Sequence, residues 1–454
     1  MDKILVANRG EIACRIMRTC HALGHATVAI HAPVEISAQH VLMAKESVAI
    51  DAATPVKSYL DGAAIIAAAK KTGADAIHPG YGFLAENADF AQSVEDSGLI
   101  FIGPRAETIA AMGDKERARS LAEAAGVPVV PGSPRFAEGD LAKITEAGNA
   151  IGYPLLVKSC AGGGGIGMRI VERPEDLEDA ARSTQTLAAR SFNDGTIFLE
   201  RYIRNARHVE VQVLGFGDGE AVHLFERECS IQRRFQKIVE ESPSPGIDDG
   251  VRASMTEAAL KLVRSVSYRG VGTLEFILDG VSQDFFFLEM NTRIQVEHPV
   301  TEMVTGRDLV ALQIGVASGR IGAKDVQQSD VVFHGNAIEA RLCAENPSRM
   351  FLPSPGELWE LHFPAEGNGV RIETGYRQGD RVTPHFDSLI AKIICHGADR
   401  HEAIERMRGA LAEIRMGEFV SNLSLLRAIV DNSAFHRGET FTDFLARNKE
   451  GLGL

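Results

Sequence analysis

The chain has 454 residues, more than one ordinary hydrophobic core accommodates, so two to four domains are expected. Hydrophobic residues make up 45% and charged residues 24%, as in typical globular proteins. The formal net charge of -13 argues against nucleic-acid binding, because phosphate neutralisation requires a basic surface. A local cationic pocket for an anionic substrate is compatible with this overall acidity.

The six cysteines are scattered and form no C-x-x-C pair, which is typical of reduced thiols in a cytosol rather than of disulfides or zinc ligands. The apolar residues 4–7 give way to polar ones at Asn8, too early for a signal peptide. No apolar run has the length needed to span a bilayer. The sequence therefore predicts a cytoplasmic protein without a membrane segment.

The first hundred residues alternate predicted strands with predicted helices. Strands are expected at residues 4–7, 27–31, 74–78 and 100–102. Helices are expected at residues 12–23 and 59–71, the first from apolar residues at a period of 3.6. This alternation predicts a parallel, doubly wound sheet. The first strand–helix turn has only Gly10 and no G-x-G-x-x-G pattern, so no dinucleotide site is expected there.

The pattern breaks at residues 130–134, a Val-Pro-Gly-Ser-Pro stretch that predicts a linker into a compact α+β unit. Strands dominate from about residue 207 to residue 291. Val209, Val211 and Val213 alternate there with polar residues, which predicts one apolar and one polar face. Beyond about residue 331, short strands and a helical region at residues 400–414 predict a further domain.

Four glycines, residues 162–165, follow an apolar predicted strand and Lys158. Without Cβ atoms, such a loop lets backbone N–H groups approach phosphate oxygens, and the lysine adds a positive charge. The lysine precedes the glycines and no G-K-[ST] follows them, so this is not a Walker A loop. For a glycine run taken alone, a hairpin without a ligand is the alternative.

A predicted hairpin of residues 271–278 and 285–291 carries three candidate metal ligands. Counting outward from its turn places Glu275 opposite Glu289, and the period of two places Asn291 on the face of Glu289. Like charges directly across a sheet are destabilising unless something compensates them. Two carboxylates and an amide suit Mg²⁺, which also holds substrate phosphates. A solvated, charged sheet face is the alternative.

Directly downstream, the same period directs Arg293, Gln295 and Glu297 toward the predicted metal ligands. The planar guanidinium of Arg293 suits an oxyanion, and Glu297 suits a general base beside it. His298 points to the other side and is expected to be structural. A basic stretch at residues 232–237 is on its own most often a solvated surface, but beside a phosphate site it can supply anion ligands.

Taken together, these segments resemble the ATP-grasp ligases and, more closely, the biotin carboxylases among them. The matching stretches are residues 7–13, 78–84, the glycine loop, 207–210, 289–299 and 351–356. They occur in the family's order over nearly the whole chain. The Glu-Met-Asn-x-Arg-x-Gln-Val-Glu-His segment is highly specific, and the glycine run is much less so.

The resemblance implies a mixed α/β and α+β chain of three domains. These are a Rossmann-like N-terminal domain at residues 1–113, an ATP-grasp domain at residues 114–330 and a C-terminal biotin carboxylase domain at residues 331–454. The ATP-grasp domain would carry a mobile glycine-loop lid at about residues 131–202. The implied reaction is ATP-dependent formation of carboxyphosphate from bicarbonate, followed by carboxylation of biotin at N1′.

The resemblance also implies a role for each matching residue. Mg²⁺ or Mn²⁺ would be held by Glu275, Glu289 and Asn291. ATP would be held by Lys115, Lys158, Gly163, Gly164, Gly165, Glu200, Arg201, Tyr202, Ile203, His208, Gln232 and the residue at position 235. Bicarbonate would be held by Lys237, Arg293, Gln295 and Val296. Glu297 would remove its proton, and Arg341 would stabilise the biotin enolate.

The sequence departs from the family pattern at Ile166 and Phe235, where a basic residue and a histidine are usual. Phenylalanine cannot hydrogen-bond a ribose hydroxyl, so these departures concern the nucleotide and not the carboxylation chemistry. No Met-Lys-Met-type attachment segment is present up to Leu454. Biotin is therefore expected on a separate biotin carboxyl carrier protein, with a carboxyltransferase in another subunit.

The family expectation is a homodimer that catalyses the first half-reaction of an acyl-CoA carboxylase, for example the acetyl-CoA carboxylase of fatty acid biosynthesis. Two alternatives remain: an ATP-grasp ligase with a different acceptor, and a non-catalytic paralogue that binds nucleotide.

Overall fold

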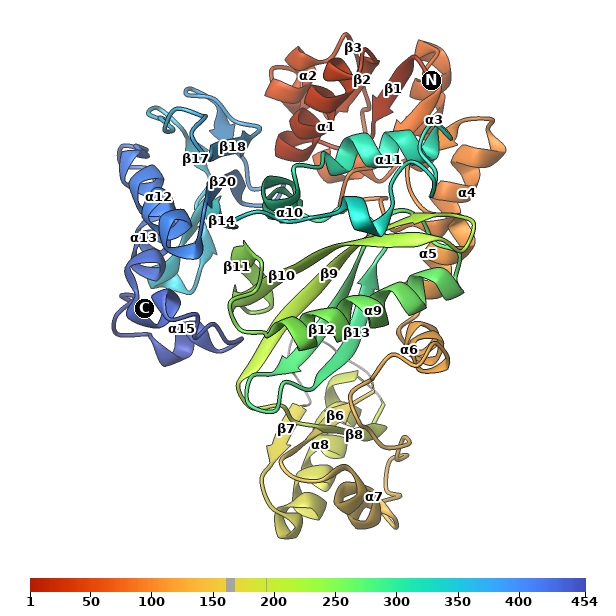
Figure 1. Cartoon of the computed structure of the whole chain (residues 1–454), viewed down its shortest axis with the longest axis vertical. Coiled ribbons are helices and arrows are strands. Elements are labelled where there is room, and N and C mark those ends of the chain that lie inside the picture. Colours follow the sequence, from red (N-terminus) through yellow and green to blue (C-terminus); the bar gives the residue numbers. More distant parts are fainter. Residues whose placement is uncertain (161–167, 193) are drawn as a thin grey trace.

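The computed structural model describes residues 1–160, 168–192 and 194–454. Its N-terminal region is a parallel sheet of order β3-β2-β1-β4-β5, flanked by helices (Figure 1). The strands are β1 Lys3–Val6, β2 Ala26–His31, β3 Glu46–Ala49, β4 Ala76–His78 and β5 Ile100–Phe101. The helices are α1 Gly10–Ala22, α2 Gln39–Met43, α3 Gly62–Thr72, α4 Ala88–Asp96 and α5 Ala106–Gly113.

The predicted doubly wound parallel sheet is thus confirmed. Helix α1 forms because Ile12, Ile16 and Cys20 recur on one buried face, and it packs in the same core as strand residues Ile4 and Val6. Strand β3 was not predicted from the sequence; it lies at the edge of the sheet and alternates half-buried and exposed residues. An edge strand of this kind lacks the continuous apolar run that reveals a buried one.

After α6, Lys115–Ala124, the chain enters a small α+β unit. Its antiparallel sheet has the order β7-β6-β8 and is covered by two helices (Figure 1). The elements are β6 Leu155–Ser159, β7 Met168–Val171, β8 Ile197–Arg201, α7 Ile144–Ile151 and α8 Leu177–Phe192. Leu155, Val157 and Leu199 form its core with Leu177. The glycine loop, including Gly163, Gly164, Gly165 and Ile166, lies outside the described residues.

A single eight-stranded sheet of order β13-β12-β9-β10-β11-β14-β20-β18 forms the rest of the frame. The strands are β9 Ala206–Phe216, β10 Ala221–Arg233, β11 Gln236–Ser242, β12 Arg269–Asp279, β13 Phe285–Asn291, β14 Asn336–Cys343, β18 Val370–Thr374 and β20 Leu389–Gly397. Strands β11 and β14 are antiparallel neighbours, with Val239 paired to Ala340. The sheet therefore continues without interruption across the position where the sequence predicts a domain boundary.

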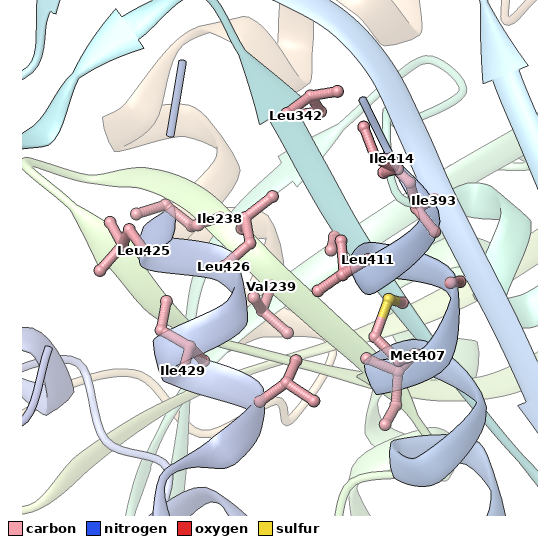
Figure 2. Close-up of a cluster of buried hydrophobic side chains, with 14 of the residues drawn as sticks. Ile238, Val239, Leu342, Ile393, Met407, Leu411, Ile414, Leu425, Leu426 and Ile429 are labelled. Carbon is pink, nitrogen blue, oxygen red and sulfur yellow. The ribbon is translucent and has the colours of Figure 1, made fainter. Parts of the chain in front are cut away.

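Helices cover this sheet at several places. They are α9 Asp249–Ser265, α10 His298–Thr305, α11 Leu309–Ala317, α12 Arg400–Glu413, α13 Leu423–Asp431, α14 Ser433–His436 and α15 Phe444–Arg447. Figure 2 shows Met407 and Leu411 of α12 facing Leu426 and Ile429 of α13, next to Ile393 of β20. Short two-stranded ribbons complete this end: β15 Glu345–Asn346 with β16 Leu352–Pro353, and β17 Gly356–Glu357 with β19 Arg381–Val382.

The polar face predicted for β9 is polar but not solvated. Glu210 and Gln212 are fully buried, as is Arg227 on the neighbouring strand β10. Arg227 donates hydrogen bonds to both, at 2.6 Å in each case. A buried charge is tolerated only when it is paired, so this network fixes the register of the two strands beside the cavity described below.

None of the helices in the part of the chain that the structure describes combines the length and the apolar character needed to cross a bilayer.

Candidate functional site

A cavity of about 690 Å³ lies where the N-terminal domain, the large sheet and the C-terminal region meet. All of the residues predicted to hold the metal and bicarbonate or to act as base and enolate stabiliser line it: Lys237, Glu275, Glu289, Asn291, Arg293, Gln295, Val296, Glu297 and Arg341. His298 does not line it; this residue is fully buried and its Nδ1 contacts the carbonyl oxygen of Gln295 at 2.7 Å. The period of two therefore correctly grouped Glu289, Asn291, Arg293, Gln295 and Glu297, whereas the roles of Lys237, Val296 and Arg341 were predicted from the family resemblance alone.

Lys237, on β11, is the charge centre of the cavity. Its Nζ donates to Glu210 Oε2 and Glu297 Oε1 at 2.6 Å each, and to Glu275 Oε1 at 3.0 Å. Burial opposes the ammonium charge, but the surrounding carboxylates outweigh it and raise the pKa of Lys237 well above its ordinary value. The lysine is therefore a permanent cation, fixed at the floor of the cavity.

The β12–β13 hairpin pairs Glu275 with Glu289, as predicted, and Thr273 with Asn291. Nearer the turn the register differs by one residue from the predicted one, with Leu278 paired to Phe285, and a register shift between Glu275 and Phe276 restores the predicted pairing. Burial and then the neighbouring Glu275 raise the pKa of Glu289. Burial opposes ionisation of Glu275, but His208 and Lys237 outweigh it and hold the pKa of Glu275 well below its ordinary value. The His208 ring nitrogen Nε2 lies 2.9 Å from Glu275 Oε2.

This donor set fits a magnesium ion. The side chain of Glu289 is half-buried and makes no hydrogen bond or ion pair to another described residue, so its carboxylate oxygens are available. Asn291 donates through Nδ2 to Glu275 Oε1 at 3.0 Å, which places the amide beside the carboxylate. Carboxylate and amide oxygens are the ligands that Mg²⁺ and Mn²⁺ prefer.

Arg293 is at the rim of the cavity and its side chain is 21% exposed. Its Nε donates to Glu86 Oε2 at 2.8 Å, and its Nη2 donates to Asn291 Oδ1 at 3.0 Å. Glu86 was not predicted from the sequence, because its partner lies 207 positions away. Gln295 is buried and donates to Glu275 Oε1 at 3.0 Å, next to Lys237.

Arg341 of β14 and Glu297 form the opposite wall. Arg341 Nη2 donates to Glu297 Oε2 at 2.9 Å and lies 2.5 Å from Oε1 of Glu240, a residue of β11. Burial opposes ionisation of Glu297, but Lys237, Arg341 and Arg227 outweigh it and hold the pKa of Glu297 below its ordinary value. Glu297 is therefore ionised, as a general base must be.

The residues predicted to hold ATP are divided between two places. His208 and Phe235 line the cavity, and Gln232 pairs with Lys237 across the β10–β11 turn. Lys158 and Glu200 pair with each other in the small α+β unit, with Nζ and Oε2 2.7 Å apart. Lys158, Glu200, Arg201, Tyr202 and Ile203 do not line the cavity, and Lys115 is exposed at the start of α6.

Further residues at the cavity were not predicted as candidates, among them Glu11, Tyr81 and Lys392. Glu11 and Tyr81 line the cavity, and Tyr81 donates its hydroxyl to Glu11 Oε2 at 2.7 Å. Lys392 of β20 is fully buried, with its Nζ 2.7 Å from Glu11 Oε1 and donating to the carbonyl oxygen of Val296 at 2.9 Å. Glu11 and Tyr81 lie in two of the stretches that match the biotin carboxylases, and this match is the sequence feature that could have identified them.

Three family models match the chain. They are the "Biotin carboxylase, N-terminal domain" over residues 1–109, the "Carbamoyl-phosphate synthase L chain, ATP binding domain" over residues 114–322, and the "Biotin carboxylase C-terminal domain" over residues 339–447. With the cavity described above, these matches define an ATP-dependent ligase.

Similar proteins identify the family of ATP-dependent ligases to which the chain belongs. Biotin carboxylase 1 of Bacillus subtilis is 48% identical over 448 residues, which cover 98% of each chain. The mitochondrial methylcrotonoyl-CoA carboxylase subunit alpha of Glycine max is 46% identical over 452 residues, all of this chain but 61% of that relative. The chain belongs to the biotin carboxylase family.

Solved structures agree with this assignment. The biotin carboxylase domain of a thermophilic 2-oxoglutarate carboxylase bound to bicarbonate has a TM-score of 0.94 and 41% identity, covering 99% of each chain. The biotin carboxylase domain dimer of the Hydrogenobacter thermophilus 2-oxoglutarate carboxylase, in complex with MgADP and bicarbonate, has a TM-score of 0.88 and 42% identity, covering 99% of this chain and 98% of that one.

Proposed function

We propose that this chain carboxylates biotin on a carrier protein, using ATP and bicarbonate, and that the cavity around Lys237 is where bicarbonate is activated. The observation that carries the proposal is the placement of an ionised carboxylate, Glu297, between two fixed cations, Lys237 and Arg341, with Arg293 at the rim. A small anion with an acidic proton finds both positive charge and a base there.

In the proposed first step, bicarbonate lies against Lys237, Arg293, Gln295 and Val296. The negative charge of bicarbonate weakens the electrostatic attraction between the cations and Glu297, which makes that carboxylate a stronger base. Glu297 accepts the bicarbonate proton while a bicarbonate oxygen bonds to the γ-phosphorus of ATP. The bond from that phosphorus to the bridging oxygen breaks, and ADP leaves with its electrons.

The product of this step is carboxyphosphate. Its carboxyl group passes to N1′ of biotin as the bond from the carboxyl carbon to the phosphate oxygen breaks, and the departing phosphate accepts the N1′ proton. Arg341 lies in the cavity wall, where its guanidinium stabilises the negative charge that develops on the biotin ring.

Glu275, Glu289 and Asn291 are the proposed holders of Mg²⁺ or Mn²⁺, which when bound would neutralise charge on the nucleotide phosphates. Lys115, Lys158, His208, Gln232 and Phe235 are proposed nucleotide contacts, together with the loop glycines and residues 200–203. The three domains keep the proposed bounds 1–113, 114–330 and 331–454, with a lid at about residues 131–202.

We propose a separate biotin carboxyl carrier protein and carboxyltransferase, as expected for a biotin carboxylase of an acyl-CoA carboxylase such as acetyl-CoA carboxylase. One similar protein is a methylcrotonoyl-CoA carboxylase subunit, so acceptors other than acetyl-CoA are the alternative. A homodimer is proposed from the similar domain that was solved as a dimer.

The test is ATP hydrolysis by the purified chain with Mg²⁺, measured with and without bicarbonate and free biotin. We expect hydrolysis that requires bicarbonate and increases with biotin, together with formation of carboxybiotin. Bicarbonate-dependent hydrolysis without any effect of biotin would favour an ATP-grasp ligase with another acceptor. Tight ATP binding without turnover would favour a non-catalytic paralogue.

Two substitutions then test the assigned roles. Glu297→Ala removes the base and Arg293→Ala removes a bicarbonate contact, so both variants should lose carboxylation while they still bind ATP. Full carboxylation by either variant would refute its role.

A further inference from the structure

Two buried glutamates lie directly behind the cavity wall, and the proposed reaction does not use them. Glu240 on β11 and Glu339 on β14 are register partners in neighbouring strands, and both are fully buried. Like charges directly across a sheet are destabilising, and burial increases the cost. At least one positive charge or one proton must therefore compensate this pair.

Arg341 forms an ion pair with one member only. Its Nη2 lies 2.5 Å from Glu240 Oε1, whereas Glu339 has neither an ion pair nor a hydrogen bond to another described residue and is influenced by Lys392 and Arg341 only at longer range. Burial raises the pKa of Glu339 well above its ordinary value. Glu339 is thus the protonated member, and Glu240 is the one that carries the charge opposite Arg341.

The same nitrogen of Arg341 also donates to Glu297 Oε2 at 2.9 Å. Glu240 and Glu297 therefore both contact the guanidinium through its single Nη2 group. No hydrogen bond from its Nη1 to another described residue is present, and Arg341 lines the cavity. Held in this way, the guanidinium has a fixed position in the cavity wall with one nitrogen available to a substrate.

Without the charge of Glu240, Glu297 would be the dominant anion in contact with Arg341. The arginine would then move toward the base, away from its place in the wall. Attraction between Arg341 and Glu297 would also stabilise the ionised form of that carboxylate and weaken it as a base. Glu240 thus affects both the cation and the base without itself lining the cavity.

We propose that Glu240 is a positioning residue for biotin carboxylation, which holds Arg341 in the cavity wall by opposing the attraction of Glu297. The proposal rests on the role of Arg341 given above. It predicts that the charge of Glu240 matters, and not only its volume in the strand.

The test is Glu240→Gln, which preserves size and removes the charge, assayed at pH 8 with biotin, bicarbonate and ATP. Loss of one charge-assisted contact should lower kcat/KM for biotin by about 10- to 100-fold. The KM for ATP should stay within about twofold of that of the wild type, because the nucleotide contacts are elsewhere. Glu240→Asp, which keeps the charge, should recover most of the activity.

The matched control is Glu241→Gln, at the next position of the same strand. Glu241 is also buried and ion-paired, to Arg400 Nε at 2.6 Å, but it does not contact Arg341. This variant suffers a comparable loss of a buried ion pair and should keep biotin kcat/KM within about twofold of the wild-type value.

A double-mutant cycle separates positioning from general stability. If Glu240 acts through Arg341, adding Glu240→Gln to Arg341→Ala should cause no further loss of activity, whereas unrelated effects would multiply. Multiplying effects, wild-type kinetics of Glu240→Gln or failure of that variant to fold would each overturn the proposal. A wild-type chain without biotin-dependent activity would instead refute the proposed function on which it rests.

Discussion

Lys237→Met is the substitution that most directly tests the charge arrangement of the cavity. It preserves the length of the side chain but removes the one cation shared by Glu210, Glu275 and Glu297. Breaking a buried ion pair from one side costs roughly 3–5 kcal/mol, because the remaining charge stays buried without compensation. The three pairs share one nitrogen and are not additive, so we expect a total loss of about this size.

The loss of folding stability in Lys237→Met should depend on pH in a defined direction. In the wild type, the pKa of Glu297 is held low, so its stabilising contribution is complete above the ordinary glutamate pKa and is lost only as the pH falls toward the lowered value. Without Lys237, burial raises the pKa of that carboxylate, and protonation relieves the penalty. The deficit of the variant should therefore be largest at pH 8 and smaller at pH 5.

Denaturant unfolding followed by circular dichroism at several pH values measures this deficit. The control is Lys158→Met, which removes one partly exposed pair with Glu200 and should cost about 0–1 kcal/mol at any of these pH values. A Lys237→Met deficit no larger than that of the control, or one that grows on acidification, would refute the reasoning.

Four further outcomes are expected. Arg293→Ala should raise the KM for bicarbonate by at least tenfold in steady-state assays, and a change confined to ATP would contradict its role. Glu289→Gln should raise the Mg²⁺ concentration needed for half-maximal activity, and an unchanged magnesium titration would count against a metal ligand there. Phe235→His should lower the KM for ATP about fivefold, because an imidazole can hydrogen-bond a ribose hydroxyl, whereas an equal or higher KM would argue against contact with the ribose. Burial raises the pKa of Glu240 to about 7, so the wild type loses stability as the pH rises from about 4.5 to about 7; Glu240→Gln should lack this loss of roughly 3 kcal/mol, and parallel stability curves would disprove it.

The local geometry of the site could be predicted because it follows from chain periodicity. Counting outward from Ser282 predicts Glu275 opposite Glu289, as observed, but this pairing also depends on a register shift between Glu275 and Phe276 that the sequence does not reveal. The same period directs Arg293, Gln295 and Glu297 to one side, and all three line the cavity. Inferences of this kind require only the order of residues within a short stretch of the sequence.

The remaining features depend on pairing between distant segments. Nothing in the stretch around Glu240 distinguishes this glutamate from a surface residue, since its burial follows from the pairing of β11 with β14. Glu86 reaches Arg293, and Lys392 reaches Glu11, across hundreds of positions. A single sequence contains no local pattern for contacts of this range, which only the assembled sheet and its neighbours create.

The uninterrupted sheet limits how this chain can be divided or recombined. Because β11 and β14 hydrogen-bond to each other, separating the chain near residue 330 would expose two strand edges and the apolar residues beneath them. Exposed edges of this kind promote aggregation. Chimeras with related carboxylases should therefore exchange the segment from β9 to β20 as one piece. A junction between β11 and β14 would place Lys237 and Arg341 on neighbouring strands that come from different proteins.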